Sequence, residues 1–417
     1  MKKKILLVLL FAIIKVEAQS SAFSAIDSLF EKGRYKFALK ELEKVKEPSF
    51  LSNYKTAIIY ESIDNYSKTA QFLEKALTFK DDYKSKLKLA KAYQRLKKAK
   101  KSIKIYEEIL SRDSLNLVLK YQLGKLYLAS KKGDNAIQTF KYLINKDSLN
   151  ANYSYQLGIA YALKNDRDRM INSFLDTYEK DSTHLKSIVR LASSFNKLKE
   201  KDSTQIFVDK GLELNELEVT LNKLKINQLY RDKKYTEAIT YLIKLDTIVK
   251  DDTYFKSMLG RTYYNIDSLD IAMKYFRKLS SIDRENFKAY TYQGHILSKQ
   301  KKYMMARFRY LMATHIGKEK RDEEYYGLGT VNFGMKKPKE AIFYFDKAYQ
   351  ENSSNYKALY QVAKLSDDYY KDKSIGYKKY VRYLERFESI DKVITEFVKK
   401  RISEIKKDYF LRGEKLE

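Results

Sequence analysis

The sequence is poor in the residues that build disulfides, thiolate metal sites and tight turns. Its 417 residues include no cysteine and no tryptophan, only two prolines and 13 glycines. The lack of cysteine excludes disulfides, a cysteine nucleophile and a lipid-modified N-terminal cysteine. A β-sandwich or barrel needs many turns, and the few prolines and glycines argue against one. The composition therefore favours helices.

Apolar and basic residues are abundant instead. The hydrophobic content of 44% and aromatic content of 14% are enough to bury a sizeable core. The formal charge of +29 favours anionic partners but carries no information about the fold. Because lysine and arginine are spread along the whole chain, a basic surface without a specific partner remains an alternative.

The first eighteen residues, MKKKILLVLLFAIIKVEA, have the three parts of a secretory signal peptide. Three lysines precede the apolar run Ile5–Ile14, and Val16-Glu17-Ala18 forms a possible cleavage site before Gln19. The apolar run is far shorter than the ~20 residues that span a bilayer. We predict a signal peptide at 1–18 and an exported mature chain, periplasmic or secreted in a Gram-negative bacterium. We expect this mature chain to have no lipid anchor and no later transmembrane span; an uncleaved N-terminal anchor is the alternative.

Short sequence segments recur at a spacing of 34 residues. The tetrapeptide YQLG occurs at 121–124 and at 155–158, and DSLN precedes each copy at 113–116 and 147–150. Gly124 is followed by Tyr127, Ala136 and Phe140, and Gly260 by the same residue types at the same offsets. Repeats can be anchored at positions 26, 57, 90, 124, 158, 192, 226, 260, 294, 329 and 363.

A fixed period of 34 with Leu-Gly-x-x-Tyr, then Ala, then Phe resembles the tetratricopeptide repeat. The usual early tryptophan and late proline of that repeat are missing. The resemblance implies an all-α, right-handed superhelical solenoid of about eleven helix-turn-helix units at 19–389. Its glycines, alanines, tyrosines and phenylalanines are expected in the core, where neighbouring repeats bury each other's apolar faces.

The C-terminal segment 390–417 is expected to be a capping helix. Its apolar residues should form one stripe that closes the last repeat. These residues are Ile390, Val393, Ile394, Phe397, Ile402 and Ile405.

No constellation for catalysis or metal binding can be identified. The three histidines, His184, His295 and His315, form no helical pair, and no glycine-rich phosphate loop occurs. The repeats, signal and cap account for the whole chain. We therefore predict a protein that is not an enzyme and that has no metal and no cofactor.

The resemblance also implies where a partner would bind. In tetratricopeptide repeats the second, fifth, ninth, twelfth and thirteenth residues of each first helix line the concave face. Two stretches follow from this rule. The first, called the basic stretch, comprises Lys186, Lys197, Lys223, Asn227, Tyr230, Arg231, Tyr254, Arg261, Tyr264, Lys288, His295 and Lys299. The second, called the aromatic patch, comprises Tyr121, Leu128, Tyr155, Ile159 and Leu163.

Lys223 and Asn227 match the first half of the clamp with which some of these domains hold a peptide carboxylate. The second half would need lysine and arginine where Thr291 and His295 stand. The clamp is therefore incomplete.

Two classes of function remain. The chain is either a scaffold of the cell envelope that binds an acidic or extended segment of another protein in its groove, or a charge-driven binder of an anionic envelope polymer. That polymer would be lipopolysaccharide, a glycan or nucleic acid, with nucleic acid the least favoured. Scaffolding is preferred because tyrosine-rich surfaces suit contact with a peptide.

Overall fold

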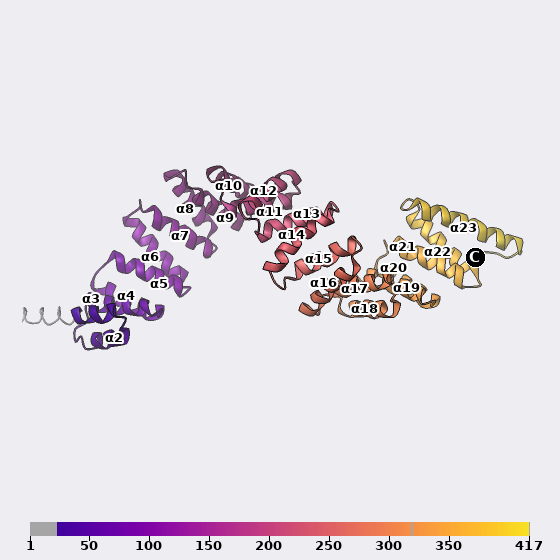
Figure 1. The fold of residues 1–417 in the computed structure, drawn as a ribbon. Coiled ribbons are helices and arrows are strands. Elements are labelled where there is room, and N and C mark those ends of the chain that lie inside the picture. Colours follow the sequence, from indigo (N-terminus) through magenta and orange to yellow (C-terminus); the bar gives the residue numbers. More distant parts are fainter. Residues whose placement is uncertain (1–22, 318–319, 417) are drawn as a thin grey trace, which may run out of the picture. The chain divides into compact units, whose positions relative to one another are not determined.

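The computed structural model describes residues 23–317 and 320–416, and within these ranges it contains helices and turns but no strand (Figure 1). The predicted signal peptide lies outside the described residues. In the described ranges, no helix is both long and apolar enough to cross a bilayer.

The chain divides into two compact units between Leu214 and Asn215. In the N-terminal unit, residues 23–31 are helical. The helices that follow are α2 (Tyr35–Glu43), α3 (Phe50–Ser62), α4 (Tyr66–Phe79), α5 (Tyr83–Arg95), α6 (Ala99–Arg112), α7 (Leu117–Ala129), α8 (Gly133–Lys146), α9 (Ala151–Leu163), α10 (Arg167–Lys180), α11 (Leu185–Leu198) and α12 (Lys201–Leu214).

The C-terminal unit continues the same alternation of helices. Its helices are α13 (Val219–Arg231), α14 (Tyr235–Ile248), α15 (Thr253–Asn265), α16 (Leu269–Ile282), α17 (Phe287–Lys299), α18 (Tyr303–Ile316), α19 (Asp322–Gly334), α20 (Pro338–Glu351), α21 (Tyr356–Tyr369), α22 (Lys373–Phe387) and α23 (Lys392–Leu411).

Each predicted repeat anchor lies in the first helix of a helix pair. The two helices of a pair pack on each other, as α7 does on α8, and within each compact unit the second also packs on the next first helix, as α8 does on α9. The described ranges hold eleven such pairs followed by α23. The predicted all-α solenoid of helix-turn-helix repeats is therefore confirmed.

The constant spacing between glycine and phenylalanine, which recurs in several repeats of the chain, has a steric cause. A Cβ atom built on Gly124 would lie 2.7 Å from Cζ of Phe140, and one on Gly158 would lie 2.5 Å from Cε1 of Phe174. Both rings are essentially buried. The ring of the second helix thus occupies the space that a side chain on the first helix would need, and the small residue allows the two helices to approach.

The turn between the two helices of a repeat contains a residue in the left-handed conformation. Near Gly124 this residue is Lys131, with φ of 57°. The amide of Lys132 then donates to the carbonyl of Tyr127, which satisfies one of the last helical carbonyls. The equivalent residues, from the first repeat to the tenth, are Gly33, Asp64, Lys97, Lys131, Asn165, Lys199, Lys233, Asp267, Lys301 and Lys336.

Helix α23 covers the last repeat, but its buried face differs from the predicted stripe. Ile390 and Val393 are 58% and 78% exposed, so the prediction was wrong for these two residues. Ile405 is buried as predicted, and Val398, which was not in the predicted stripe, is buried as well. Ile394, Phe397 and Ile402 are partly covered, because the helix meets the repeat along a face rotated from the expected one.

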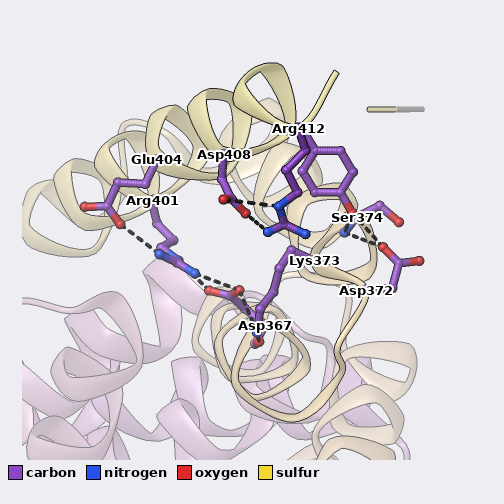
Figure 2. A network of polar contacts seen from close by, with 9 residues as sticks. Asp367, Asp372, Lys373, Ser374, Arg401, Glu404, Asp408 and Arg412 are labelled. Atoms are coloured by element: carbon purple, nitrogen blue, oxygen red, sulfur yellow. Dashed lines mark hydrogen bonds and ion pairs between the residues drawn. The ribbon is translucent and has the colours of Figure 1, made fainter. Parts of the chain in front are cut away.

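A polar network fixes α23 to the last repeat (Figure 2). Nε and Nη2 of Arg401 donate to the two carboxylate oxygens of Asp367 on α21, at 2.6 and 3.1 Å. Nη1 of Arg401 donates to Glu404, and Lys373 donates to the backbone carbonyl of Asp367. Asp367 is only 3% exposed. The capping helix is therefore held by a bidentate ion pair as well as by apolar contacts.

Candidate functional site

The groove positions of the N-terminal unit open into a hollow of about 790 Å³ on α5 and α7. Its lining includes an aliphatic part and a polar part. The lining residues are Tyr83, Leu87, Lys91, Gln94, Arg95, Tyr106, Asn116, Val118, Leu119 and Gln122. Val118 is 74% exposed, which leaves an apolar side chain open to a partner.

Lys91 and Arg95 line this hollow, and Lys84 and Lys125 stand on the same two helices, α5 and α7. These four cations are named here the N-terminal basic cluster. Within the described residues none of the four forms an ion pair, although neighbouring Lys88 pairs with Glu61 at 2.6 Å. Arg95 lies over the ring of Tyr66 at 5.8 Å, and Lys125 lies over Tyr121 at 5.6 Å. The positive charge of the hollow is therefore not neutralised by an ion pair within the described residues.

The aromatic patch lies next to this hollow and is partly used for packing. Tyr121 contacts the ring of Tyr153, with centroids 5.6 Å apart, and Lys125. Tyr155 packs on Phe174 and on the imidazole of His184, at 5.6 and 4.8 Å. Leu128 and Ile159 are half-buried, and Leu163 is 37% exposed. The side chains of the aromatic patch are therefore only partly accessible to a partner.

The basic stretch divides between the two compact units. Lys186 and Lys197 belong to the N-terminal unit, where both are exposed. The other members belong to the C-terminal unit, where most of the charged members have partners on the same surface.

The half clamp is occupied by groups of the chain itself. Nζ of Lys223 lies 3.3 Å from Oδ2 of Asp252 and 4.8 Å from the ring centroid of Tyr254. The hydroxyl of Tyr254 donates to Oδ1 of Asn227 at 3.0 Å. Burial is the main cause that raises the pKa of Tyr254 to about 12, which keeps this hydroxyl protonated. Lys223 is thus already paired with a carboxylate of the chain, and Asn227 accepts a hydrogen bond through Oδ1.

Most of the other groove cations of the C-terminal unit are also engaged. The guanidinium of Arg261 lies 4.8 Å from the ring centroid of Tyr230. Nζ of Lys299 pairs with Asp267 at 3.1 Å and lies over the ring of Tyr264. Arg231 is exposed and forms no ion pair within the described residues. The basic stretch therefore carries much less free charge than its sequence suggests.

A second hollow, of about 440 Å³, opens on α17 and α19. It contains Tyr264, His295, Lys299, Glu323, Tyr326 and Lys357, with further polar groups at its rim. Nδ1 of His295 lies 2.8 Å from the hydroxyl of Tyr310, and burial strongly raises the pKa of that hydroxyl. Hydrogen bonds from His295 and Lys288 lower the pKa of Glu323 to about 2. Polar groups in this hollow therefore bond to one another, and tyrosine side chains form part of its wall.

The residues of the N-terminal basic cluster were not among the predicted site residues. Leu87, Lys91, Gln94 and Arg95 are nevertheless the fifth, ninth, twelfth and thirteenth residues of α5, and Lys125 is the ninth residue of α7. The positional rule that predicts the basic stretch also selects these positions, so the signal is present in the sequence.

Comparison with known proteins agrees with the repeat. Residues 84–114 and residues 255–286 each match a model of the tetratricopeptide repeat. The search of curated proteins gives no match. Each of the two matched segments coincides with a helix pair of the structure, α5 with α6 and α15 with α16.

Several solved structures are similar to the chain at low identity. Yeast Tom70 is 15% identical, with 94% of this chain and 96% of that one covered and a TM-score of 0.41. PilF of Pseudomonas aeruginosa is 16% identical, with 54% and 99% covered and a TM-score of 0.42. MamA of Desulfovibrio magneticus RS-1 is 20% identical, with 41% and 96% covered and a TM-score of 0.37.

The family assignment rests on the two matched segments and on the repeat itself. The 34-residue period extends from these segments through the neighbouring helix pairs. A glycine and an aromatic ring meet at equivalent positions in several repeats. The chain therefore contains tetratricopeptide repeats.

Proposed function

We propose that the chain is a non-enzymatic scaffold that binds an acidic, extended segment of another protein. The N-terminal basic cluster supports this proposal most directly, because Lys91 and Arg95 line a hollow, Lys84 and Lys125 stand on the same helices, and none of the four forms an ion pair within the described residues. Val118 and Tyr121 supply apolar contact beside these cations. Charge would raise the rate of encounter, and the apolar side chains would slow dissociation once the segment is seated.

The basic stretch remains a second candidate site. Lys186, Lys197 and Arg231 are its exposed cations without an ion pair in the described residues. At Lys223, Lys288 and Lys299 an acidic partner would have to replace a carboxylate that already pairs with the lysine. The net gain in electrostatic energy is smaller for such an exchange than for binding to a free cation.

Export to the cell envelope belongs to the same proposal. Its support is the N-terminal sequence pattern, and the intact mass of the protein recovered from the envelope fraction tests it. A mature chain that begins near Gln19 is expected. Recovery of the full-length chain from the cytosol would contradict export.

The groove is tested with a charge-reversed variant and a matched control. In the first variant, Lys91, Arg95 and Lys125 become Glu. In the control, Lys100, Lys104 and Lys141 become Glu; these are exposed residues of the second helices α6 and α8, without ion pairs in the described ranges. Both variants change the net charge equally. The probe is a fluorescein-labelled random copolymer of Glu and Tyr, followed by fluorescence anisotropy.

The proposal predicts that only the groove variant loses affinity. Three exposed charge contacts, each worth ~1 kcal/mol or less, are lost together, so the affinity should fall by about tenfold or more. Equal losses in both variants would instead favour the charge-driven binding of an anionic envelope polymer. Steep weakening with salt would accompany that result. If neither variant loses affinity, the N-terminal basic cluster is not the site, and Tyr155→Ala in the aromatic patch becomes the next variant.

A further inference from the structure

Helix α18 differs in composition from the other second helices. Its sequence, YMMARFRYLMATHI, contains two arginines, one histidine and no carboxylate. In the described residues each other second helix, from α2 to α22, carries at least one Asp or Glu. The surface that α18 presents is therefore purely apolar and cationic.

Large apolar side chains of α18 point into solvent. Met304, Phe308 and Leu311 are 66%, 60% and 36% exposed, and their spacing of four and three residues places them on one face of the helix. Met305 beside them is 52% exposed. The opposite face, with Ala306 and Tyr310, is buried in the core. We call the four exposed residues the α18 stripe.

A cationic hollow of about 390 Å³ lies beside the stripe, between α16 and α18. Lys274, Arg277 and Lys302 line it, and none of the three forms an ion pair within the described residues. Asp270 is the acidic group of the lining, and it accepts a hydrogen bond from Gln300 at 3.2 Å. Met305 belongs both to the stripe and to the hollow. The apolar and the cationic surfaces are therefore continuous.

We propose that this face docks the protein on an anionic phospholipid surface. Met304, Phe308 and Leu311 would enter the interfacial region of the bilayer, and the cationic hollow would receive a phosphate headgroup. Apolar side chains flanked by Lys and Arg are the combination that binds anionic membranes from one side. Arg309, whose guanidinium carbon lies 5.9 Å from the ring centroid of Phe308, adds a cation at the edge of the stripe.

The charge of the face argues against a second copy of the chain as its occupant. Two copies of an α18 face would bring the same unpaired cations together, and the whole chain carries a formal charge of +29. Like charges oppose such a contact. The lipid surface is complementary in both respects, since it offers negative headgroups above an apolar layer. This site lies on the second helices and is separate from the proposed groove on the first helices.

Vesicle flotation of the full chain tests the proposal. Vesicles of phosphatidylcholine alone are compared with vesicles that also contain phosphatidylglycerol. The apolar variant carries Met304→Gln, Phe308→Gln and Leu311→Gln, and the cation variant carries Lys274→Gln, Arg277→Gln and Lys302→Gln. The control carries Lys100→Gln, Lys104→Gln and Lys141→Gln, which remove the same charge from second helices elsewhere. Circular dichroism confirms the fold of each variant, since all substituted side chains are exposed.

The chain should float with the anionic vesicles only. Each of the two site variants should lower the partition coefficient by about tenfold or more, while the control stays within about twofold of the natural sequence. Equal losses in the cation variant and the control would show bulk attraction and overturn the proposal. So would a loss confined to the cation variant, because the stripe would then not enter the bilayer. Failure to bind anionic vesicles would also overturn it and leave the stripe to an acidic protein partner.

Discussion

The Nε2 atom of His295 lies 2.9 Å from Oε1 of Glu323, and the Nζ atom of Lys288 lies 2.8 Å from the second oxygen of the same carboxylate. These contacts connect α17 with α19, the first helices of two consecutive repeats. They also engage one cation, Lys288, and the imidazole of His295, both members of the basic stretch. Part of the positive charge that the sequence places in the groove thus stabilises the contact between repeats.

This carboxylate predicts an acid-dependent stability. Hydrogen bonds from His295 and Lys288 lower the pKa of Glu323 from its ordinary 4.5 to about 2. A lowered carboxylate pKa stabilises the folded state above the unfolded pKa, and this contribution is lost as the pH falls through the folded value. Unfolding at a series of pH values should show that Glu323→Gln is less stable than the natural sequence above about pH 4.5, with the difference vanishing toward pH 2.

The matched control for this titration is Glu340→Gln, at an exposed carboxylate of α20 that forms no ion pair within the described residues. It should leave the pH dependence unchanged. A Glu323→Gln variant that keeps the same deficit at pH 2 as at pH 6 would show that ionisation of Glu323 is not the cause.

A buried ion pair gives a second prediction. Lys256 of α15 is 1% exposed, and its ammonium donates to the carboxylate of Asp246 on α14. Asp246→Ala leaves a buried ammonium without a partner and should cost ~3–5 kcal/mol of unfolding free energy. Lys256→Met should cost less, because Asp246 is 17% exposed and can be hydrated. Urea denaturation measures both variants.

An exposed ion pair in the same unit supplies the comparison. Lys244 pairs with Glu216, and the two side chains are 45% and 68% exposed. Glu216→Ala should therefore change the unfolding free energy by ~1 kcal/mol or less. Equal effects of Asp246→Ala and Glu216→Ala would mean that Lys256 reaches solvent in the folded protein.

The repeat architecture could be read from the sequence because it depends on local periodicity. The anchors at Gly124, Gly158 and Gly260 and the rings sixteen residues later are in direct contact, as the spacing predicted. Side chains that meet at a fixed separation within one repeat leave a regular signature in the chain. The fold of the described residues follows from that signature.

The charge state of the groove could not be read in the same way. The positional rule assigns Lys223 to the surface, but its partner Asp252 is 29 residues away and stands just before the next first helix. A rule that considers one helix at a time omits such neighbours. The left-handed turn residues were also hidden, since Lys131 takes a positive φ while Gly133 opens the next helix. Glycine is the usual residue for that conformation.

A third prediction concerns the close contact between the two helices of a repeat. A Cβ on Gly260 would lie 2.8 Å from Cζ of Phe276, so Gly260→Leu should overpack the repeat and cost ~1–3 kcal/mol or more. Ala272→Leu, at a fully buried position of the same repeat, should act similarly. Because each repeat contacts only its neighbours, hydrogen exchange should rise in α13 to α18 before it rises in distant helices.

A double variant tests the cause of this effect. If the ring of Phe276 is what a side chain at position 260 meets, the cost of Gly260→Leu in a Phe276→Ala background should be smaller than in the natural sequence. Additive costs would show that the ring is not the obstacle. Uniform loss of protection along the chain would contradict the nearest-neighbour character of the solenoid.

The last prediction concerns the attachment of α23. The guanidinium of Arg401 makes two hydrogen bonds to Asp367, which is 3% exposed (Figure 2). Arg401→Met should cost ~3–5 kcal/mol, because Asp367 keeps only Lys373 as a partner, with Nζ 3.8 Å from Oδ1. Arg401→Lys keeps the charge but not the two parallel hydrogen bonds, so its unfolding free energy should lie between that of the natural sequence and that of Arg401→Met. The control is Arg412→Met, whose pair with Asp408 is about half exposed and should be worth ~0.5 kcal/mol or less.

Hydrogen exchange in Arg401→Met should rise first in α23 and then in α21 and α22, since the cap shields the last repeat. If α23 kept its protection in Arg401→Met, the apolar contacts of Val398 and Ile405 alone would hold the cap.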